Sequence, residues 1–152
     1  MLSIPKKFTL VAGDAEGTSE LNAFDNALLI SGIGNLNLIK VSSILPPKAE
    51  FCEQLEIPPG SLTPTAFGTK ICENQGELIA AAVGVGLSKD TFGMIMEYSG
   101  HCSREEAEAE VSRMVKEAFI SRSLSLEKIM MKSVEHRVER IGCVFAAVAL
   151  WE

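Results

Sequence analysis

Two short stretches hold side chains whose type and setting could support chemistry. Ser42 and Ser43 stand together at the end of an apolar run, directly before the sequence ILPP. Glu97 is the only charged residue in the apolar stretch MIMEY (94–98), and a carboxylate is costly to bury unless it is paired or protonated. The serines also suit a polar strand end, and Glu97 also suits a solvent-facing strand position. These residues alone therefore indicate a folded domain with one unusual acid.

Several common sites are excluded by the residue types. Gly32 and Gly34 are followed by Asn37 where the dinucleotide-binding fingerprint needs a third glycine, and the sequence holds neither a P-loop nor a G-x-S-x-G elbow. The two histidines, His101 and His136, and four widely spaced cysteines form no ligand motif. We therefore expect no metal.

The elements that must position the serines lie in the first third of the chain. The run 8–12 predicts a strand that Gly13 closes, followed by a loop. A helix is then predicted, with Asn22 as its N-cap and Gly32 as a left-handed C-cap. Alternating side chains predict one strand over 35–44, which the proline pair after it stops.

The remaining two thirds predict a strand-rich domain with a second helix. Ser103 and Glu106 match a capping box, and apolar residues recur at helical spacing after them. Strands are predicted at 78–87, 91–98, 126–138 and 141–151. This order predicts a single α+β domain in which helices lie against sheets.

Composition and charge narrow the class of protein. A chain of 152 residues that is 47% hydrophobic can build a core without disulfides. The net charge of −6, with no basic segment, argues against nucleic acid as a partner. The apolar runs 78–87 and 141–151 are shorter than the roughly 20 residues of a membrane-spanning helix. With no signal-peptide core and no cysteine framework, we expect a cytoplasmic protein without membrane contact.

Most of the chain resembles the family of pyruvoyl-dependent arginine decarboxylases. The resemblance is carried, in order, by ELNAFDNALLISGIGNLNLIKVSSILPP (20–47), PTAFG (64–68), GELIAAAVGVG (76–86), GMIMEYSGHCSREEAE (93–108) and VEHRVERIGCVFAAVALW (134–151). It implies a four-layer αββα sandwich of two face-to-face sheets with flanking helices, associated as a homotrimer.

The resemblance also implies that the chain is a zymogen that makes its own cofactor. The Ser43 hydroxyl would attack the Ser42 carbonyl, and elimination and hydrolysis would leave a pyruvoyl group in place of Ser43. The chain would split into 1–42 (the beta chain) and 43–152 (the alpha chain). The pyruvoyl ketone would form a Schiff base with L-arginine and release CO2 and agmatine, a precursor of polyamines, without a metal or pyridoxal phosphate.

The same resemblance assigns roles to three further side chains. Glu97 matches the proton donor, and its apolar flanks would raise its pKa. Asn37 matches a polar residue that orients the self-cleavage or the substrate. Asp25 matches the carboxylate that receives the substrate guanidinium, although without the resemblance a role in capping its helix would be favoured.

Three alternatives remain open at this point. The chain could decarboxylate another amino acid through the same group, because only Asp25 indicates a cationic substrate. It could be a self-cleaving amidase that exposes an N-terminal serine. It could also be an unprocessed, non-catalytic binding module.

Overall fold

The chain forms nine strands and two helices within the described residues, 2–152 of this computed structural model. In chain order they are β1 (Lys7–Glu16), α1 (Glu20–Ser31), β2 (Asn37–Lys40), β3 (Ile44–Leu45), β4 (Glu50–Phe51), β5 (Leu62–Cys72), β6 (Leu78–Leu87), β7 (Gly93–Gly100), α2 (Arg104–Ser121), β8 (Lys128–Arg137) and β9 (Gly142–Trp151).

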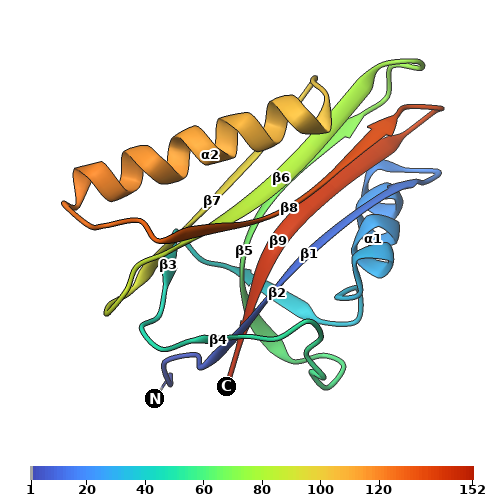
Figure 1. Ribbon diagram of the computed structural model, residues 1–152. Coiled ribbons are helices and arrows are strands. Elements are labelled where there is room, and N and C mark those ends of the chain that lie inside the picture. Colours follow the sequence, from blue (N-terminus) through green and yellow to red (C-terminus); the bar gives the residue numbers. More distant parts are fainter. Residues whose placement is uncertain (1) are drawn as a thin grey trace.

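These elements stack in four layers (Figure 1). A five-stranded sheet with the order β2-β5-β9-β1-β4 packs on a four-stranded sheet with the order β3-β7-β6-β8. Helix α1 packs on the outer face of the first sheet, and α2 packs on the outer face of the second. This is the expected α+β domain with αββα layers.

The two most buried strands explain the two longest apolar runs. One face of β6 and one face of β9 meet in the core between the sheets, together with side chains of β1, β5 and β7. The other face of β6 packs against α2, and the other face of β9 packs against α1. Because both faces are covered, every position favours an apolar side chain. The predicted strands 78–87 and 141–151 are thereby confirmed. Neither helix within residues 2–152 is both long and apolar enough to cross a membrane.

Two of the three predicted helix ends are confirmed. Gly32 is the C-cap of α1 with φ 92°, in the left-handed region that favours glycine. Ser103 and Glu106 form both hydrogen bonds of the capping box that begins α2. The prediction that Asn22 caps α1 is wrong. The cap is Ser19, whose hydroxyl accepts a hydrogen bond from the Asn22 backbone N–H at 3.1 Å.

Two other local predictions are also wrong, and each has a packing cause. Strand β1 continues past Gly13 to Glu16, because it pairs with β9 over its whole length. Gly13 does not end the strand but lets α1 approach, since an added Cβ would lie 2.5 Å from the Ala27 carbonyl oxygen. The single strand predicted at 35–44 is divided into β2 and β3, because the chain leaves one sheet and enters the other at Val41–Ser43.

Candidate functional site

The serine pair lies in the segment that connects the two sheets. Strands β2 and β3 are edge strands of different sheets, next to β5 and β7 respectively, and β5 packs on β7. The Val41 backbone N–H donates to the Thr65 carbonyl oxygen on β5 at 3.1 Å. The Ile95 backbone N–H donates to the Ser43 carbonyl oxygen at 2.7 Å. The Ser42–Ser43 peptide therefore extends from an anchor on one sheet to an anchor on the other.

Glu97 lies two residues after the anchor of Ser43 on the same strand. Ile95 belongs to the core between the sheets, and residues two apart on a strand share a face, so Glu97 points into the same layer. It packs against Gly68 of β5, where an added Cβ would lie 3.2 Å from the Glu97 Cγ. The Oε2 atom of Glu97 is buried and has no hydrogen-bond partner among residues 2–152. The sequence singled out this acid as unusual, and the structure places it between the sheets, where a carboxyl oxygen without a partner is uncommon.

The electrostatic setting favours the protonated form of Glu97. Burial raises the pKa of its carboxyl, and the positive charge of Lys40 partly opposes that rise. Lys40 ends β2, and its Nζ lies 4.7 Å from the centre of the Phe67 ring, a distance typical of a cation–π contact. A buried carboxyl with a raised pKa can hold a proton near neutral pH and deliver it to a nearby atom.

An apolar pocket opens beside the serine pair. Its volume is about 640 Å³, and Ser42 is one of the few polar residues that line it. The other lining residues come from the N-terminal segment, the crossover, β5 and the C-terminus: Leu2, Ser3, Ile4, Pro5, Val41, Ile44, Pro46, Pro47, Leu62, Pro64, Leu150, Trp151 and Glu152. Ser42 is exposed and Ser43 is half-buried, so this side of the Ser42–Ser43 peptide lies at the surface of a single chain.

Neither Ser42 nor Ser43 has a backbone φ in the strained left-handed region. Within residues 2–152, the residues other than glycine with positive φ are Lys48 and Ser123. The anchors of Val41 and Ser43 on opposite sheets, rather than unfavourable φ values, hold the segment in place.

Neither Asn37 nor Asp25 lies on β7, the strand that anchors Ser43 and carries Glu97. Asn37 begins β2, and its Nδ2 donates to the Gly60 carbonyl oxygen at 3.0 Å, so it holds the loop before β5. Asp25 is exposed on α1, and α1 packs on the outer face of the five-stranded sheet. Since Glu97 lies between the sheets, one chain alone brings Ser43 and Glu97 together but leaves Asp25 on the other side of a sheet.

Two residues of the site were not found from the sequence. Gly68 makes room for the Glu97 stem, and Lys40 sets the charge near its carboxyl. Lys40 does carry a signal, since it is the only charged residue in NLNLIKVSSI (35–44). Gly68 carries none, because only the packing of β5 on β7 explains why a side chain is absent there.

Comparisons with known proteins show that the chain is similar to one family. The family model described as pyruvoyl-dependent arginine decarboxylase matches residues 7–152. A pyruvoyl-dependent arginine decarboxylase of Methanocaldococcus jannaschii is 51% identical over 150 residues, which cover 97% of this chain and 91% of the relative. One from Pyrococcus furiosus is 44% identical over 151 residues, covering 97% of this chain and 96% of the relative.

Among solved structures, a pyruvoyl-dependent histidine decarboxylase at pH 8 has a similar fold. The TM-score is 0.51 at 18% sequence identity, and the match covers 63% of this chain. This chain spans 52% of the length of that chain. The likeness supports the arrangement of helices and packed sheets.

Proposed function

The chain belongs to the family of pyruvoyl-dependent arginine decarboxylases, and from this premise we propose that it converts L-arginine to agmatine and CO2 with a pyruvoyl group made from Ser43. The observation that carries the proposal is the hydrogen bond between Ile95 and Ser43, which holds Ser43 on the strand pair that also carries Glu97. A buried carboxyl oxygen without a hydrogen-bond partner among residues 2–152 suits a reacting group formed at that point.

The group arises from the chain itself. The Ser43 Oγ attacks the Ser42 carbonyl carbon, the peptide C–N bond breaks, and the Ser43 nitrogen gains a proton. Loss of the Ser43 Cα proton and cleavage of its Cβ–O bond then release Ser42 as a C-terminal carboxylate. Water replaces the nitrogen of the remaining unsaturated residue, and ammonia leaves. The products are residues 1–42 and residues 43–152 with a ketone at the new N-terminus.

The two products would stay associated after cleavage. Residues 1–42 contain β1, α1 and β2. Strand β1 pairs with β9 along its whole length, from Lys7 opposite Trp151 to Glu16 opposite Gly142. Strand β2 pairs with β5, and α1 buries its apolar face against β9. The zymogen therefore has the layers of the mature enzyme before its peptide bond breaks.

Glu97 acts as the general acid of the reaction. When present, the pyruvoyl group supplies a carbonyl that accepts the electron pair left on the substrate α-carbon as CO2 departs. Glu97 then delivers a proton to that carbon, because burial keeps its carboxyl protonated at higher pH than usual. Gly68 and Lys40 position this carboxyl and adjust its proton affinity.

Asp25 receives the guanidinium of arginine, and Asn37 orients the substrate or the scissile peptide. A planar guanidinium pairs well with a carboxylate, and Asp25 is exposed and available for such a partner. In a single chain Asp25 lies on the outer side of the five-stranded sheet. We therefore assign the complete site to two subunits, with Asp25 from one and Glu97 from the other.

A homotrimer would bring these parts together. Ile4, Ile44 and Leu62 line the pocket beside Ser42, and each is 42% exposed or more. Exposed apolar side chains around a hollow are typical of a surface that another subunit covers. We place the subunit contact at this pocket. Static light scattering checks it, and a fully active monomer would contradict it.

A cytoplasmic location agrees with the sulfur chemistry. All four cysteines are free, as is usual in a reducing compartment. Agmatine formed there would feed polyamine synthesis.

A pair of serine variants tests the proposal. Ser43→Ala removes the attacking hydroxyl, so it should remain one uncut chain without decarboxylase activity. Ser42→Ala, the matched control, keeps the carbonyl that is attacked and should still be cut. Efficient cleavage of Ser43→Ala would refute the assigned bond. Release of CO2 from arginine, lysine, ornithine, histidine and aspartate identifies the substrate, and a preference for an amino acid other than arginine would refute the role of Asp25.

A further inference from the structure

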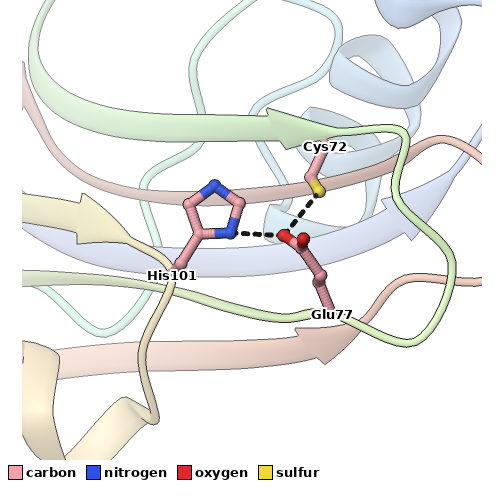
Figure 2. A group of neighbouring side chains, drawn as sticks. All are labelled: Cys72, Glu77 and His101. Carbon is pink, nitrogen blue, oxygen red and sulfur yellow. Dashed lines mark hydrogen bonds and ion pairs between the residues drawn. The ribbon is translucent and has the colours of Figure 1, made fainter.

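Three side chains of different chemistry meet at the far end of the sandwich from Ser43. Cys72 ends β5, Glu77 precedes β6, and His101 follows β7. Figure 2 shows the thiol, the carboxylate and the imidazole pointing toward one another. One potential ligand atom of each lies within 4.8 Å of the other two. Three chain segments thus bring one sulfur, one oxygen and one nitrogen to a single point.

The hydrogen bonds within this cluster centre on one oxygen atom. Glu77 Oε2 lies 2.7 Å from the His101 Nδ1 and 3.5 Å from the Cys72 Sγ. Asn74 holds the other groups in place: its Nδ2 donates to Glu77 Oε1 at 3.2 Å, and its backbone N–H donates to the Cys72 Sγ at 3.4 Å. The N–H donated to sulfur orients the Cys72 side chain, and the bond to Oε1 orients the Glu77 carboxylate so that Oε2 faces Cys72 and His101. Such supporting contacts are characteristic of metal ligands.

We propose that Cys72, Glu77 and His101 bind a zinc ion. A thiolate, an imidazole and a carboxylate together match the ligands that Zn²⁺ prefers, whereas Mg²⁺ and Ca²⁺ prefer oxygen alone. Tetrahedral zinc places its ligand atoms roughly 3.4–3.6 Å apart. The distance of 3.5 Å between the Cys72 Sγ and Glu77 Oε2 already fits, and a rotation of the half-exposed imidazole adjusts the third ligand.

The protons balance in a simple way. Binding releases the Cys72 thiol proton to solvent and displaces the proton that lies between His101 Nδ1 and Glu77 Oε2. Neutral His101 then carries its proton on Nε2 and binds the ion through Nδ1. The fourth position opens toward a surface hollow lined by Asn74, Glu77, Leu78 and His101, where a water molecule completes the tetrahedron.

The ion would stabilise the fold and take no part in decarboxylation. His101 lies six residues beyond Ile95, the anchor of Ser43, which is roughly 20 Å along an extended strand. The ion would tie the β5–β6 loop to the segment between β7 and α2. We therefore expect zinc to raise the melting temperature and to leave kcat unchanged.

Metal titration of the purified protein tests this proposal. After treatment with a chelator, wild type should bind one equivalent of Zn²⁺ in competition with a chromophoric chelator, and Co²⁺ should give a thiolate charge-transfer band. Cys72→Ser should lose that band, and Glu77→Gln should weaken Zn²⁺ binding about tenfold or more. Cys102→Ser is the matched control, a neighbouring half-buried thiol outside the cluster, and should bind as wild type does.

The outcomes are separable from those for decarboxylation. If Cys72→Ser, which alters a buried residue, does not fold, His101→Ala replaces it, since His101 is 48% exposed and its loss should also weaken binding about tenfold or more. No Zn²⁺ binding by wild type, or equal binding by wild type and the ligand variants, would overturn the proposal.

Discussion

Glu97 combines two properties that a proton donor needs. Its carboxyl is held by the packing of β7 on β5, and burial raises its pKa. Lys40 acts in the opposite direction, since its positive charge favours the carboxylate. Proton delivery requires the protonated form. The rate should therefore be highest below the raised pKa of Glu97 and fall as the pH rises through it.

The first prediction concerns this balance of burial and charge. Lys40→Met removes the charge that lowers the pKa of Glu97, so the fall in kcat should move to higher pH. The pH profile of kcat measures the shift, and Lys89→Met, which changes an exposed turn residue, serves as the control. Glu97→Gln should lower kcat by about 10²–10⁴-fold and abolish the fall of kcat at high pH. If kcat of Lys40→Met falls at the same pH as kcat of wild type, a group other than Glu97 titrates.

The second prediction concerns the space beside the acid. Gly68→Ala adds a Cβ 3.2 Å from the Glu97 Cγ, so the Glu97 side chain must shift by a few tenths of an ångström. A misplaced general acid should lower kcat about tenfold or more while cleavage stays complete. Gly100→Ala is the matched control, because its added Cβ would meet the movable end of Tyr98 at the same distance. Equal kcat in both variants would contradict the positioning role of Gly68.

At the scale of elements, the crossing of the chain from one sheet to the other at Ser42–Ser43 could not be predicted from the sequence. The alternation over 35–44 is correct for a strand, yet local pattern cannot tell that the partner changes from β5 to β7 within it. The covered strands and the capping box were predictable, because they depend on periodicity and on local hydrogen bonds. Ser43 and Glu97 stand out by residue type and take their expected roles from the family resemblance, but that both lie along β7 follows only from the pairing of β3 with β7.

Besides the Ser42–Ser43 segment, a group of side chains at the C-terminal end of β1 links the two sheets. His136 of β8 bonds through Nδ1 to Asp14 at 2.8 Å and through Nε2 to Glu16 at 2.5 Å. Burial alone would lower the pKa of His136, but the hydrogen bonds and charges of Glu16 and Asp14 raise it on balance. Burial would raise the pKa of Glu16, but bonds from His136 and from two backbone N–H groups lower it on balance.

The third prediction follows from the direction of these shifts. Because the pKa of His136 is raised by folding, its contribution to stability is complete below its unfolded pKa of about 6.5 and is lost as the pH rises through the folded value. His136→Gln should therefore destabilise the protein by about 1.5–3 kcal/mol near pH 6 and by less near pH 9. Urea unfolding at both pH values measures this. In chelator-treated, metal-free protein, His101→Gln, whose partner Glu77 is also exposed, should show a smaller effect. Equal destabilisation by His136→Gln at the two pH values would refute the charged link.

At the scale of the whole molecule, the four layers separate residues that the proposed reaction needs together. Asp25 on α1 and Glu97 between the sheets lie on opposite sides of the five-stranded sheet. The sequence could assign both residues through family resemblance, but it could not show that one chain keeps them apart. The proposed assembly, which covers the apolar pocket beside Ser42, would resolve this separation.

The fourth prediction tests the shared site. Asp25→Ala and Glu97→Gln should each be weakly active, the first chiefly through a higher KM because the carboxylate contacts the substrate far from the reacting carbon. Co-expression of the two variants should yield mixed trimers in which some sites combine an intact Asp25 with an intact Glu97, so activity at low arginine should exceed the sum of the separate variants. Activity no greater than that sum would place both residues in one chain.

The formation of a pyruvoyl group from Ser43 is the central claim, and intact-mass spectrometry of the purified, denatured protein tests it most directly. We predict two species, one of residues 1–42 with a free carboxylate and one of residues 43–152 that is lighter by one ammonia than the same fragment beginning with serine. A single uncut chain, or a fragment beginning with an unmodified serine, would contradict the account.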